Sequence, residues 1–282
     1  MVYFECVQMI SYRMSVQNIS VMSFNIRWLN DEYDHGKRHW NVRKDAVVEI
    51  IRKYSPDILC LQEAVLTQVE GLASELTNYQ YYAVYRDGKK EGESCAIFYN
   101  PKVVSNISER TFWLSETPET PSLSWGAMYE RMCSVIQFRL IPGGTEFTVA
   151  NTHFDHKSRV ASQNSANLVI QELNPLGEKG PLILLGDFNL ARHSPIYNQF
   201  LGDGYQDLSQ EPEIVAKTDP KWVTSHAFRG TTSTRVLSND RFCIDWILFK
   251  HLIPISYSVC FDKPKGIYAS DHWPIIGYFE FE

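Results

Sequence analysis

The segment Leu182-Ile183-Leu184-Leu185-Gly186-Asp187-Phe188-Asn189 is a short apolar run that ends in a glycine and two polar side chains. Four apolar residues in a row indicate a strand that is buried on both faces. A glycine before the acid lets the backbone turn sharply, so that Asp187 and Asn189 project into one space. An aspartate there can orient a water molecule, and an asparagine can hold that water or a developing negative charge. An Asx turn explains either residue singly but explains both together less well.

Four other segments place polar side chains beside short apolar runs in a similar way. They hold Asn25 after Val21–Phe24, Glu63 after Ile58–Gln62, His153 after Val149–Thr152, and Asp271 with His272 just before Trp273–Ile275. Carboxylates, amides and imidazoles at strand ends are the groups that a metal-assisted hydrolase needs. A turn at Asn25 and a solvated glutamate at a helix start remain simpler explanations of those two positions.

Asp245 is predicted to lie inside the apolar strand that ends at Phe249. A carboxylate in such a strand is costly to bury unless it is paired. His272 is the natural partner, because an Asp–His pair fixes the ring tautomer and keeps the imidazole basic. Asp271 then faces the opposite way on an extended chain, or faces a metal if the segment is a loop.

His153 is a second histidine with a chemical role open to it, since an imidazole can donate a proton to a leaving oxygen or stabilise a phosphorus centre. A buried histidine with satisfied hydrogen bonds is the alternative. Asp155 and His156, which follow closely, either support the site or lie on an exposed loop.

The bulk composition is that of a globular protein, with 282 residues of which 44% are hydrophobic and 21% charged. The net charge of −6 argues against charge-driven binding to long nucleic acid, but it leaves room for a nucleotide or phosphodiester held locally. Six cysteines without a C-x-x-C pair suggest no zinc or redox site. We interpret them as reduced and structural, which favours a cytoplasmic location. No apolar run approaches the roughly 20 residues of a membrane helix, so no membrane insertion is expected.

The chain shows neither a linker nor an internal repeat, and we expect one domain over residues 17–282 after an N-terminal extension of residues 1–16. The apolar periodicity predicts helices over residues 41–54, 65–77, 158–173 and 195–201, with Ser158 capping the third. Strands are predicted near residues 57–62, 79–86, 94–100, 103–113, 131–140, 145–151, 181–186, 243–249, 254–261 and 274–280. The polar stretch 203–240 is predicted to be irregular and to be a candidate substrate-selecting loop. This mixed order predicts an α+β fold of two packed sheets with helices outside, rather than a doubly wound parallel sheet.

The polar segments, taken together and in this order, resemble the endonuclease/exonuclease/phosphatase superfamily, whose members are phosphohydrolases similar to DNase I and to AP endonucleases. The matching residues are Ser23–Arg27, Leu61–Glu63, Asn151–His153, Gly186–Asn189, Ile244–Ile247 and Ser270–His272. The resemblance runs from about residue 19 to residue 279. It implies a DNase I-like, four-layer αββα sandwich of two mixed sheets, with the site at one end of both sheets.

The resemblance also implies roles for these residues. Mg²⁺ or Mn²⁺ would be held by Glu63, with Asn25 and Asp271 close by. Asp187 and Asn189 would orient the attacking water and the phosphate, and His153 would stabilise or protonate at phosphorus. His272, paired with Asp245, would contact the phosphate or act as a base, and Asn151 is expected to contact the phosphate.

A finer resemblance lies in Thr111–Pro118, Trp125–Ala127 and Arg131, which are similar to a bacterial and fungal branch near the deadenylase-like members. Arg131 is a candidate phosphate contact, because a guanidinium matches phosphate oxygens in a fork. An arginine on a surface strand explains it equally well.

The resemblance leads us to expect a metal-dependent phosphodiesterase or nuclease that acts as a monomer on short or single-stranded nucleic acid or on a nucleotide. The alternative within the fold is a phosphatase for a small phosphorylated metabolite or for an inositol or lipid headgroup. A binding module of the same fold without catalysis is disfavoured, because every polar residue of the pattern is present.

Overall fold

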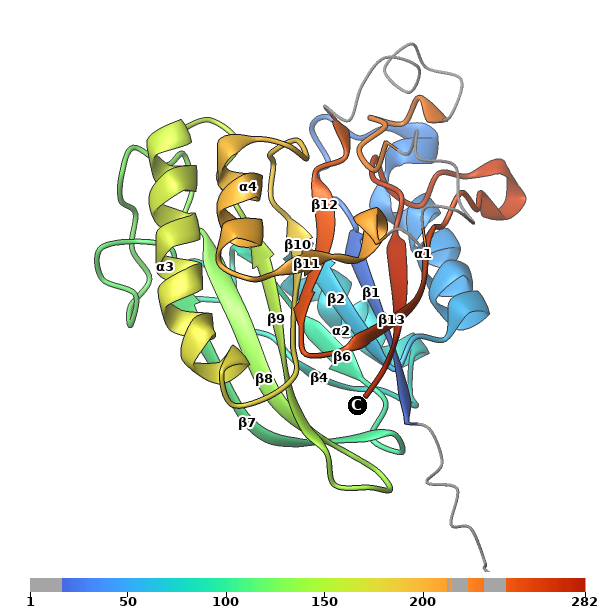
Figure 1. Ribbon diagram of the computed structural model, residues 1–282. Coiled ribbons are helices and arrows are strands. Elements are labelled where there is room, and N and C mark those ends of the chain that lie inside the picture. Colours follow the sequence, from blue (N-terminus) through green and yellow to red (C-terminus); the bar gives the residue numbers. More distant parts are fainter. Residues whose placement is uncertain (1–16, 212–213, 215–222, 231–241, 282) are drawn as a thin grey trace, which may run out of the picture.

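The computed structural model describes residues 17–211, 214, 223–230 and 242–281 (Figure 1). The N-terminal extension predicted for residues 1–16 lies outside the described residues. Within the described part, the strands form two six-stranded mixed sheets and one small two-stranded sheet, accompanied by four α-helices.

The strand order brings sequence-distant segments side by side. The first sheet has the order β13 (Ile253–Val259), β14 (Ile275–Glu280), β1 (Asn18–Asn25), β2 (Ile58–Gln62), β6 (Ile97–Tyr99) and β4 (Gln80–Tyr82). The second has the order β11 (Gln206–Asp207), β12 (Asp245–Lys250), β10 (Leu182–Asp187), β9 (Glu146–His153), β8 (Met132–Leu140) and β7 (Val104–Trp113). The small sheet pairs β3 (Ala64–Val65) with β5 (Glu93–Ser94).

One parallel pair lies in the middle of each large sheet, and the other neighbouring strands are antiparallel. The parallel pairs are β1 with β2 and β9 with β10. Their registers place Asn25 opposite Gln62 and Asp187 opposite His153, so that each pair ends in polar residues at one edge. The fold therefore collects the polar strand ends that the sequence pattern singled out.

Three separate apolar layers hold the sandwich together. Alternate residues of a strand point to opposite faces, so Val21 of β1 packs between the sheets while Met22 packs under the helices. Helices α1 (Trp40–Tyr54) and α2 (Leu66–Glu75) cover the first sheet, and α3 (Arg159–Gly177) and α4 (Pro195–Gly202) cover the second (Figure 1). The predicted four-layer αββα architecture is confirmed.

The four helices begin and end within a few residues of the predicted positions. The Ser158 hydroxyl accepts the backbone N–H of Ala161, which confirms the predicted cap of α3. Helix α3 continues to Gly177, four residues past its predicted end, through Pro175. A proline this close to the C-terminus interrupts only the last turn.

Three strand predictions need correction. The strand predicted near residues 79–86 is short, with β4 covering only Gln80–Tyr82 before the chain turns. The strand predicted near residues 94–100 is divided, because β5 pairs with β3 whereas β6 pairs with β2 and β4. Finally, β12 begins at Asp245, since the Phe242 carbonyl accepts the N–H groups of Thr224 and Ser225 and the Cys243 carbonyl accepts the Trp246 indole N–H. Asp245 therefore lies at a strand start and not in a strand interior.

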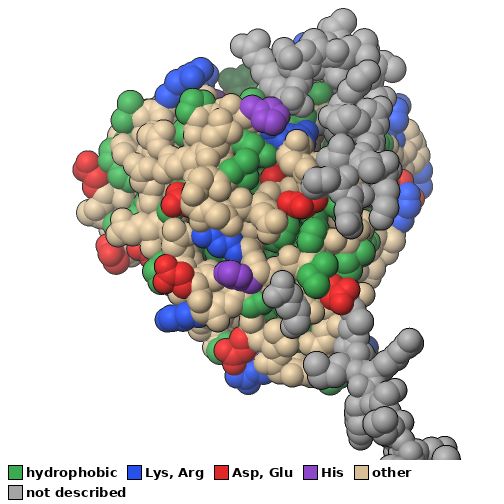
Figure 2. Space-filling model, in the orientation of Figure 1, with side chains coloured by type: hydrophobic (Ala, Val, Ile, Leu, Met, Phe, Trp, Pro, Cys, Tyr) green, Lys and Arg blue, Asp and Glu red, His purple; other side chains and the backbone are tan. Residues whose placement is uncertain are grey.

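The stretch 203–240, which was predicted to be irregular, is only partly described. It contains β11 and a short 3₁₀ helix, η2 (Leu208–Gln210), while residues 212–213, 215–222 and 231–240 lie outside the described part. No described helix combines the length and the apolar character needed to cross a membrane. Acidic and basic side chains are interspersed over the face shown in Figure 2.

Gly186 of β10 cannot be replaced by another residue without steric strain. Its φ of +145° is unfavourable for residues with a side chain, and a Cβ atom would lie 2.0 Å from the carbonyl oxygen of Thr152 on β9. The glycine is therefore required by the close approach of two parallel backbones, as well as by the conformation that presents Asp187.

We expect Gly186→Ala to lower the free energy of unfolding by about 2 kcal/mol or more, because the new methyl group must displace backbone. Denaturant unfolding measures the change. Gly202→Ala is the control, since a Cβ there meets nothing within 4 Å. Equal unfolding midpoints for the two variants would contradict the steric explanation.

Candidate active site

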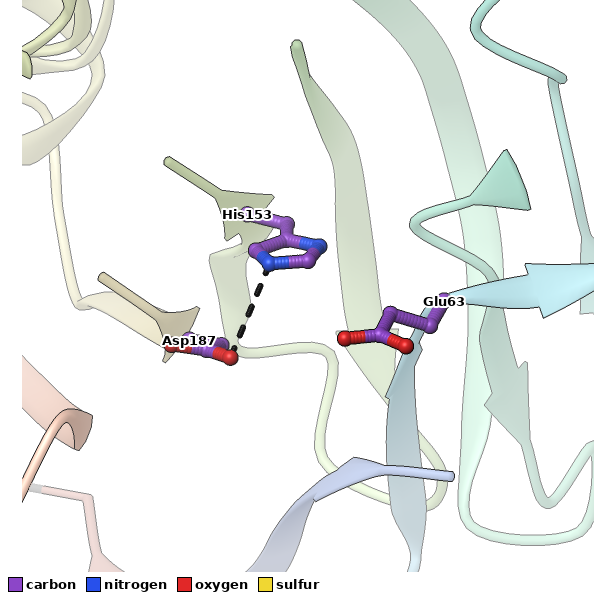
Figure 3. Close-up of side chains that lie close together, drawn as sticks. All are labelled: Glu63, His153 and Asp187. Carbon is purple, nitrogen blue, oxygen red and sulfur yellow. Dashed lines mark ion pairs between the residues drawn. The ribbon is translucent and has the colours of Figure 1, made fainter. Parts of the chain in front are cut away.

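The two sheets meet through polar side chains at the ends of their parallel strands. The Asn25 amide nitrogen donates to Glu63 Oε1 and to Asp187 Oδ2, each at 2.9 Å. Glu63 directly follows β2 of the first sheet and faces His153 and Asp187 of the second (Figure 3). One ligand atom from each of Glu63, His153 and Asp187 lies within 4.8 Å of the others. Their contacts thus form one site that spans both sheets.

Glu63 is held in an unusual backbone conformation directly after β2. Its φ is +61°, in the left-handed region that costs a non-glycine residue about 1 kcal/mol or more. Its second carboxylate oxygen, Oε2, accepts the backbone N–H of Trp28 at 3.1 Å. Strain of this kind persists where the surroundings enforce it, and here it directs the carboxylate into the site.

Asp187 is buried and accepts hydrogen bonds on both oxygens. Oδ1 accepts the backbone N–H of Asn189 at 2.9 Å, and Oδ2 accepts the Asn25 amide. Burial and the neighbouring Asp245 carboxylate raise the pKa of Asp187 to about 7. A carboxyl group with such a pKa can accept a proton from water near neutral pH.

His153 is oriented by a buried arginine. Arg131 Nη1 lies 2.8 Å from His153 Nδ1, and a guanidinium can only donate. Burial and the positive charge of Arg131 hold the pKa of His153 well below its ordinary value. The neutral ring therefore carries its proton on Nε2, and the acceptor nearest to it is Asp187 Oδ2 at 3.6 Å. The Asn189 amide nitrogen, 3.0 Å from Nε2, is itself a donor and donates to the Phe154 carbonyl.

His272 has the opposite electrostatic environment. The predicted contact with Asp245 is present, with 2.9 Å between His272 Nδ1 and Asp245 Oδ2. Burial disfavours the charged ring, but Asp245 and Asp187 together outweigh it and raise the pKa of His272 well above its ordinary value. His272 Nε2 lies 3.8 Å from Asp187 Oδ2, so a charged imidazole faces the buried carboxylate.

Asp271 points away from its neighbour His272 and pairs with an arginine. Its Oδ2 lies 3.0 Å from Arg27 Nη1, and Arg27 also pairs with Asp34 at 2.6 Å. Although burial works the other way, the positive charges of His272 and Arg27 lower the pKa of Asp271. The metal contact expected of Asp271 stays a prediction, and its carboxylate is outside the group formed by Glu63, His153 and Asp187.

Asn151 lies between the sheets. Its amide nitrogen donates to the carbonyls of Leu61 and Ala96, and its amide oxygen accepts from Gln62. These bonds place Asn151 as a cross-sheet tie below the site. The phosphate contacts expected of Asn151 and Arg131 stay predictions, and the Arg131 guanidinium contacts His153, His156 and Glu93.

A cleft of about 330 Å³ opens over the site and includes residues that the sequence pattern did not single out. Among them are Trp28, Glu93 and Tyr129. Burial and the like charge of Glu63 raise the pKa of Glu93 to about 7. The signal for Glu93 was present in the sequence, since this acid directly precedes Ser94 and the apolar run Cys95–Tyr99, but a search for polar residues after strands passes over it.

Asp155 holds the loop that carries Tyr129. Its carboxylate accepts the backbone N–H groups of Lys157 and Ser158 at the start of α3, at 2.8 and 2.6 Å. It also accepts the N–H of Met128 at 2.9 Å. Although burial opposes it, these hydrogen bonds lower the pKa of Asp155. Asp155 is thus a buried support of the site's wall and not an exposed loop residue.

The chain is similar to known proteins over most of its length. A model of the endonuclease/exonuclease/phosphatase family matches residues 22–272. The structure of a family protein from Bacteroides thetaiotaomicron is 29% identical with a TM-score of 0.83, and the match covers 95% of this chain and 99% of that one. A mannosyl-6-phosphatase from the same bacterium is 30% identical with a TM-score of 0.81, over 93% and 100% of the two chains.

A more distant relative, nocturnin from Drosophila melanogaster, is 25% identical to this chain. The match covers 86% of this chain but only 42% of that protein. The superfamily resemblance inferred from the sequence is confirmed.

We expect Asp155→Asn to destabilise the protein by about 1–3 kcal/mol at neutral pH, because one amide cannot replace the carboxylate for all three N–H donors. The pKa of Asp155 is lowered on folding, so its stabilisation is present above the unfolded pKa of about 3.9 and is lost as the pH falls further. Unfolding curves between pH 7 and pH 3 should therefore converge for the two proteins. Glu119→Gln, an exposed change on the loop between β7 and β8 that also carries Tyr129, is the control. A difference in stability between wild type and Asp155→Asn that stays constant at all pH values would contradict the carboxylate's role.

In metal-free protein, Asp245→Asn should lower the pKa of His272, because burial remains while the neighbouring negative charge is removed. NMR titration of the imidazole resonances measures the shift. Asp262→Asn removes a carboxylate that instead contacts Lys53 and Tyr54, so it should leave His272 unchanged. Identical His272 titration curves in the wild type and Asp245→Asn would show that the pair does not set the charge.

Proposed function

The chain belongs to the endonuclease/exonuclease/phosphatase family, and we propose that it hydrolyses phosphate esters by in-line attack of a water molecule, assisted by a divalent cation. The observation that carries the proposal is the joint approach of Glu63, His153 and Asp187 to within 4.8 Å, with His272 beside them. A carboxylate pair, a neutral imidazole and a charged imidazole supply a base, a proton donor and positive charge at one place.

Mg²⁺ or Mn²⁺ is the proposed cofactor, and the donor set fits it. Glu63 and Asp187 offer carboxylate oxygens, which hard divalent cations prefer, and the Asn25 amide nitrogen bridges them as a hydrogen-bond donor and not as a ligand atom. Of the three expected ligands, Asn25, Glu63 and Asp271, this proposal places Glu63 at the centre of the cation site, because the Asn25 oxygen accepts the backbone N–H of Arg27 and Asp271 pairs with the Arg27 side chain. A bound cation would neutralise negative charge on the phosphoryl group and on the clustered carboxylates.

The side chains of this protein divide the remaining work. Asp187, supported by Asn189, orients the attacking water and accepts its proton. Protonated His272, polarised by Asp245, stabilises negative charge on the phosphoryl oxygens, and the Nε2–H of His153 hydrogen-bonds to the phosphoryl or leaving oxygen. Arg131 supports this by keeping His153 neutral and in one tautomer.

A small phosphomonoester is the substrate class that the cleft supports best. The 330 Å³ volume is at the lower end of small-molecule sites, and its described lining sets the carboxylates Glu63, Glu93 and Asp187 against one arginine, Arg131. A nucleic acid strand needs cations along its backbone, and the described lining of the cleft contains a single arginine and no lysine. Similarity to a mannosyl-6-phosphatase supports the same choice.

A phosphodiesterase or nuclease acting on short nucleic acid or a nucleotide is the second candidate. Trp28 and Tyr129 favour it, because both line the cleft with about 40% of each residue exposed and aromatic rings stack on bases. The similarity to nocturnin gives it further support.

We also propose that the protein is a cytoplasmic monomer. The free cysteines at five described positions support a location in a reducing compartment.

Release of free phosphate distinguishes the two candidates. Sugar phosphates and p-nitrophenyl phosphate should give metal-dependent phosphate release, and bis-p-nitrophenyl phosphate, poly(A) and single-stranded DNA should be poor substrates. Turnover of the diesters at rates above those of the monoesters would favour the second candidate. No turnover of either class would contradict the proposed function.

Glu63→Gln should reduce phosphate release by roughly 100-fold or more at saturating Mg²⁺, because it removes a carboxylate from the donor set without changing its shape. Chelation of metal should stop the wild-type reaction, and Mg²⁺ or Mn²⁺ should restore it. Glu70→Gln, on the exposed face of α2, is the control and should retain full activity. Retained activity in Glu63→Gln would refute its role in holding the cation.

A further inference from the structure

A group of side chains lines the cleft beside the reacting residues and takes no part in the chemistry proposed above. Glu93, Tyr129 and His156 form this group, which we call the Glu93 wall. Glu93 lies on β5, which pairs with β3 directly after Glu63, so the wall begins next to the proposed cation site. The wall, His153 and His272 line the same cleft, so a group attached to a phosphate held by the two histidines can reach the wall.

Two arginine side chains hold the Glu93 carboxylate in place. Its Oε2 lies 2.9 Å from Arg86 Nη1 and 4.0 Å from Arg131 Nη1, and its side chain is 13% exposed. A carboxyl oxygen in this position accepts hydrogen bonds from hydroxyl groups. When it is ionised, the same carboxylate repels a second phosphate that approaches it, in a cleft where screening by water is reduced.

Tyr129 supplies a flat surface beside that carboxyl group. Its ring stacks on His156 with 6.4 Å between ring centroids and 24° between planes. The guanidinium carbon of Arg86 lies 4.6 Å from the centroid of the same ring. With Arg86 also holding Glu93, the carboxyl group and the aromatic ring share one support and keep a fixed relation to each other.

Resting on the proposed function, we propose that the Glu93 wall binds the group that carries the phosphate and selects a neutral, hydroxyl-rich group of hexose size. Hydroxyls would donate to Glu93, and the C–H edges of a sugar ring would lie on the electron-rich face of Tyr129. A group with a second phosphate would face the Glu93 charge. The free sugar phosphate and the phosphorylated end of a glycan share this chemistry.

Binding of non-hydrolysable ligands to the Mg²⁺-loaded protein tests the proposal without turnover. Calorimetry would compare a hexose 6-phosphonate, its methyl glycoside and methylphosphonate, which lacks the sugar. We expect at least one of the two sugar ligands to bind the wild type about tenfold more tightly than methylphosphonate. Preference for the methyl glycoside would identify a glycan end as the source, and preference for the free hexose would identify a free sugar phosphate.

Glu93→Gln and Tyr129→Ala should each remove most of this tenfold advantage while leaving the affinity for methylphosphonate within twofold. Tyr129 is partly exposed, so its truncation keeps the fold even if Glu93→Gln does not. Glu91→Gln, an exposed change on the same segment, is the matched control and should retain the advantage. Equal affinity of the wild type for all three ligands, or a parallel loss for all three in the variants, would overturn the proposal.

The binding result separates this inference from the reaction that it extends. Tighter binding of the sugar ligands by a protein that hydrolyses no phosphate ester would refute the proposed function but support the Glu93 wall as a sugar-binding site. Hydrolysis of p-nitrophenyl phosphate without any sugar preference would support the proposed function and refute the proposal that the Glu93 wall binds a sugar.

Discussion

The hydrogen bond from the Asn25 amide to Asp187 joins the two sheets at the end where the parallel strands finish. Asn25 ends β1 of the first sheet, and Asp187 ends β10 of the second. The same amide contacts Glu63, so a single side chain sets the separation of two carboxylates that belong to different sheets. The geometry of the site therefore depends on this hydrogen bond, and the hydrogen bond can form only because the two sheets pack closely together.

Several acidic side chains are buried near the Asn25–Asp187 hydrogen bond, and they determine the charges of the neighbouring groups. Asp187 and Asp245 lie opposite each other in register on β10 and β12, and each contributes an atom to a group with His272 that spans 4.8 Å. Adjacent carboxylates in a poorly solvated place attract positive charge. The protein supplies part of it through His272, and a divalent cation held by Glu63 would supply more. His153 is kept neutral by Arg131, so the two histidines are adapted to different tasks.

The site could be predicted from the sequence wherever a polar residue follows a buried strand of a parallel pair. Asn25, Glu63, His153 and Asp187 have this pattern, and all four meet. Glu93 was missed because the chain runs antiparallel there, so the residue that reaches the same edge precedes its apolar run instead of following it. Tyr129 has no local signal, since its place depends on a distant contact between Met128 and Asp155.

Other features escaped prediction because they depend on partners distant in the sequence. The alternation of side chains predicted that Asp271 and His272 would diverge, but only the fold shows that Asp271 faces Arg27. The start of β12 at Asp245 follows from the contact of the Phe242 carbonyl with Thr224 and Ser225, which apolar periodicity does not reveal. Helix positions were predictable because their apolar faces and caps are local.

Anomalous scattering from crystals soaked with Mn²⁺ and phosphate tests the central claim most directly. The account predicts a manganese peak in contact with the Glu63 carboxylate, with phosphate between that ion and the side chains of His153 and His272. A manganese ion bound at Asp245 and His272, with Glu63 making no metal contact, would contradict it.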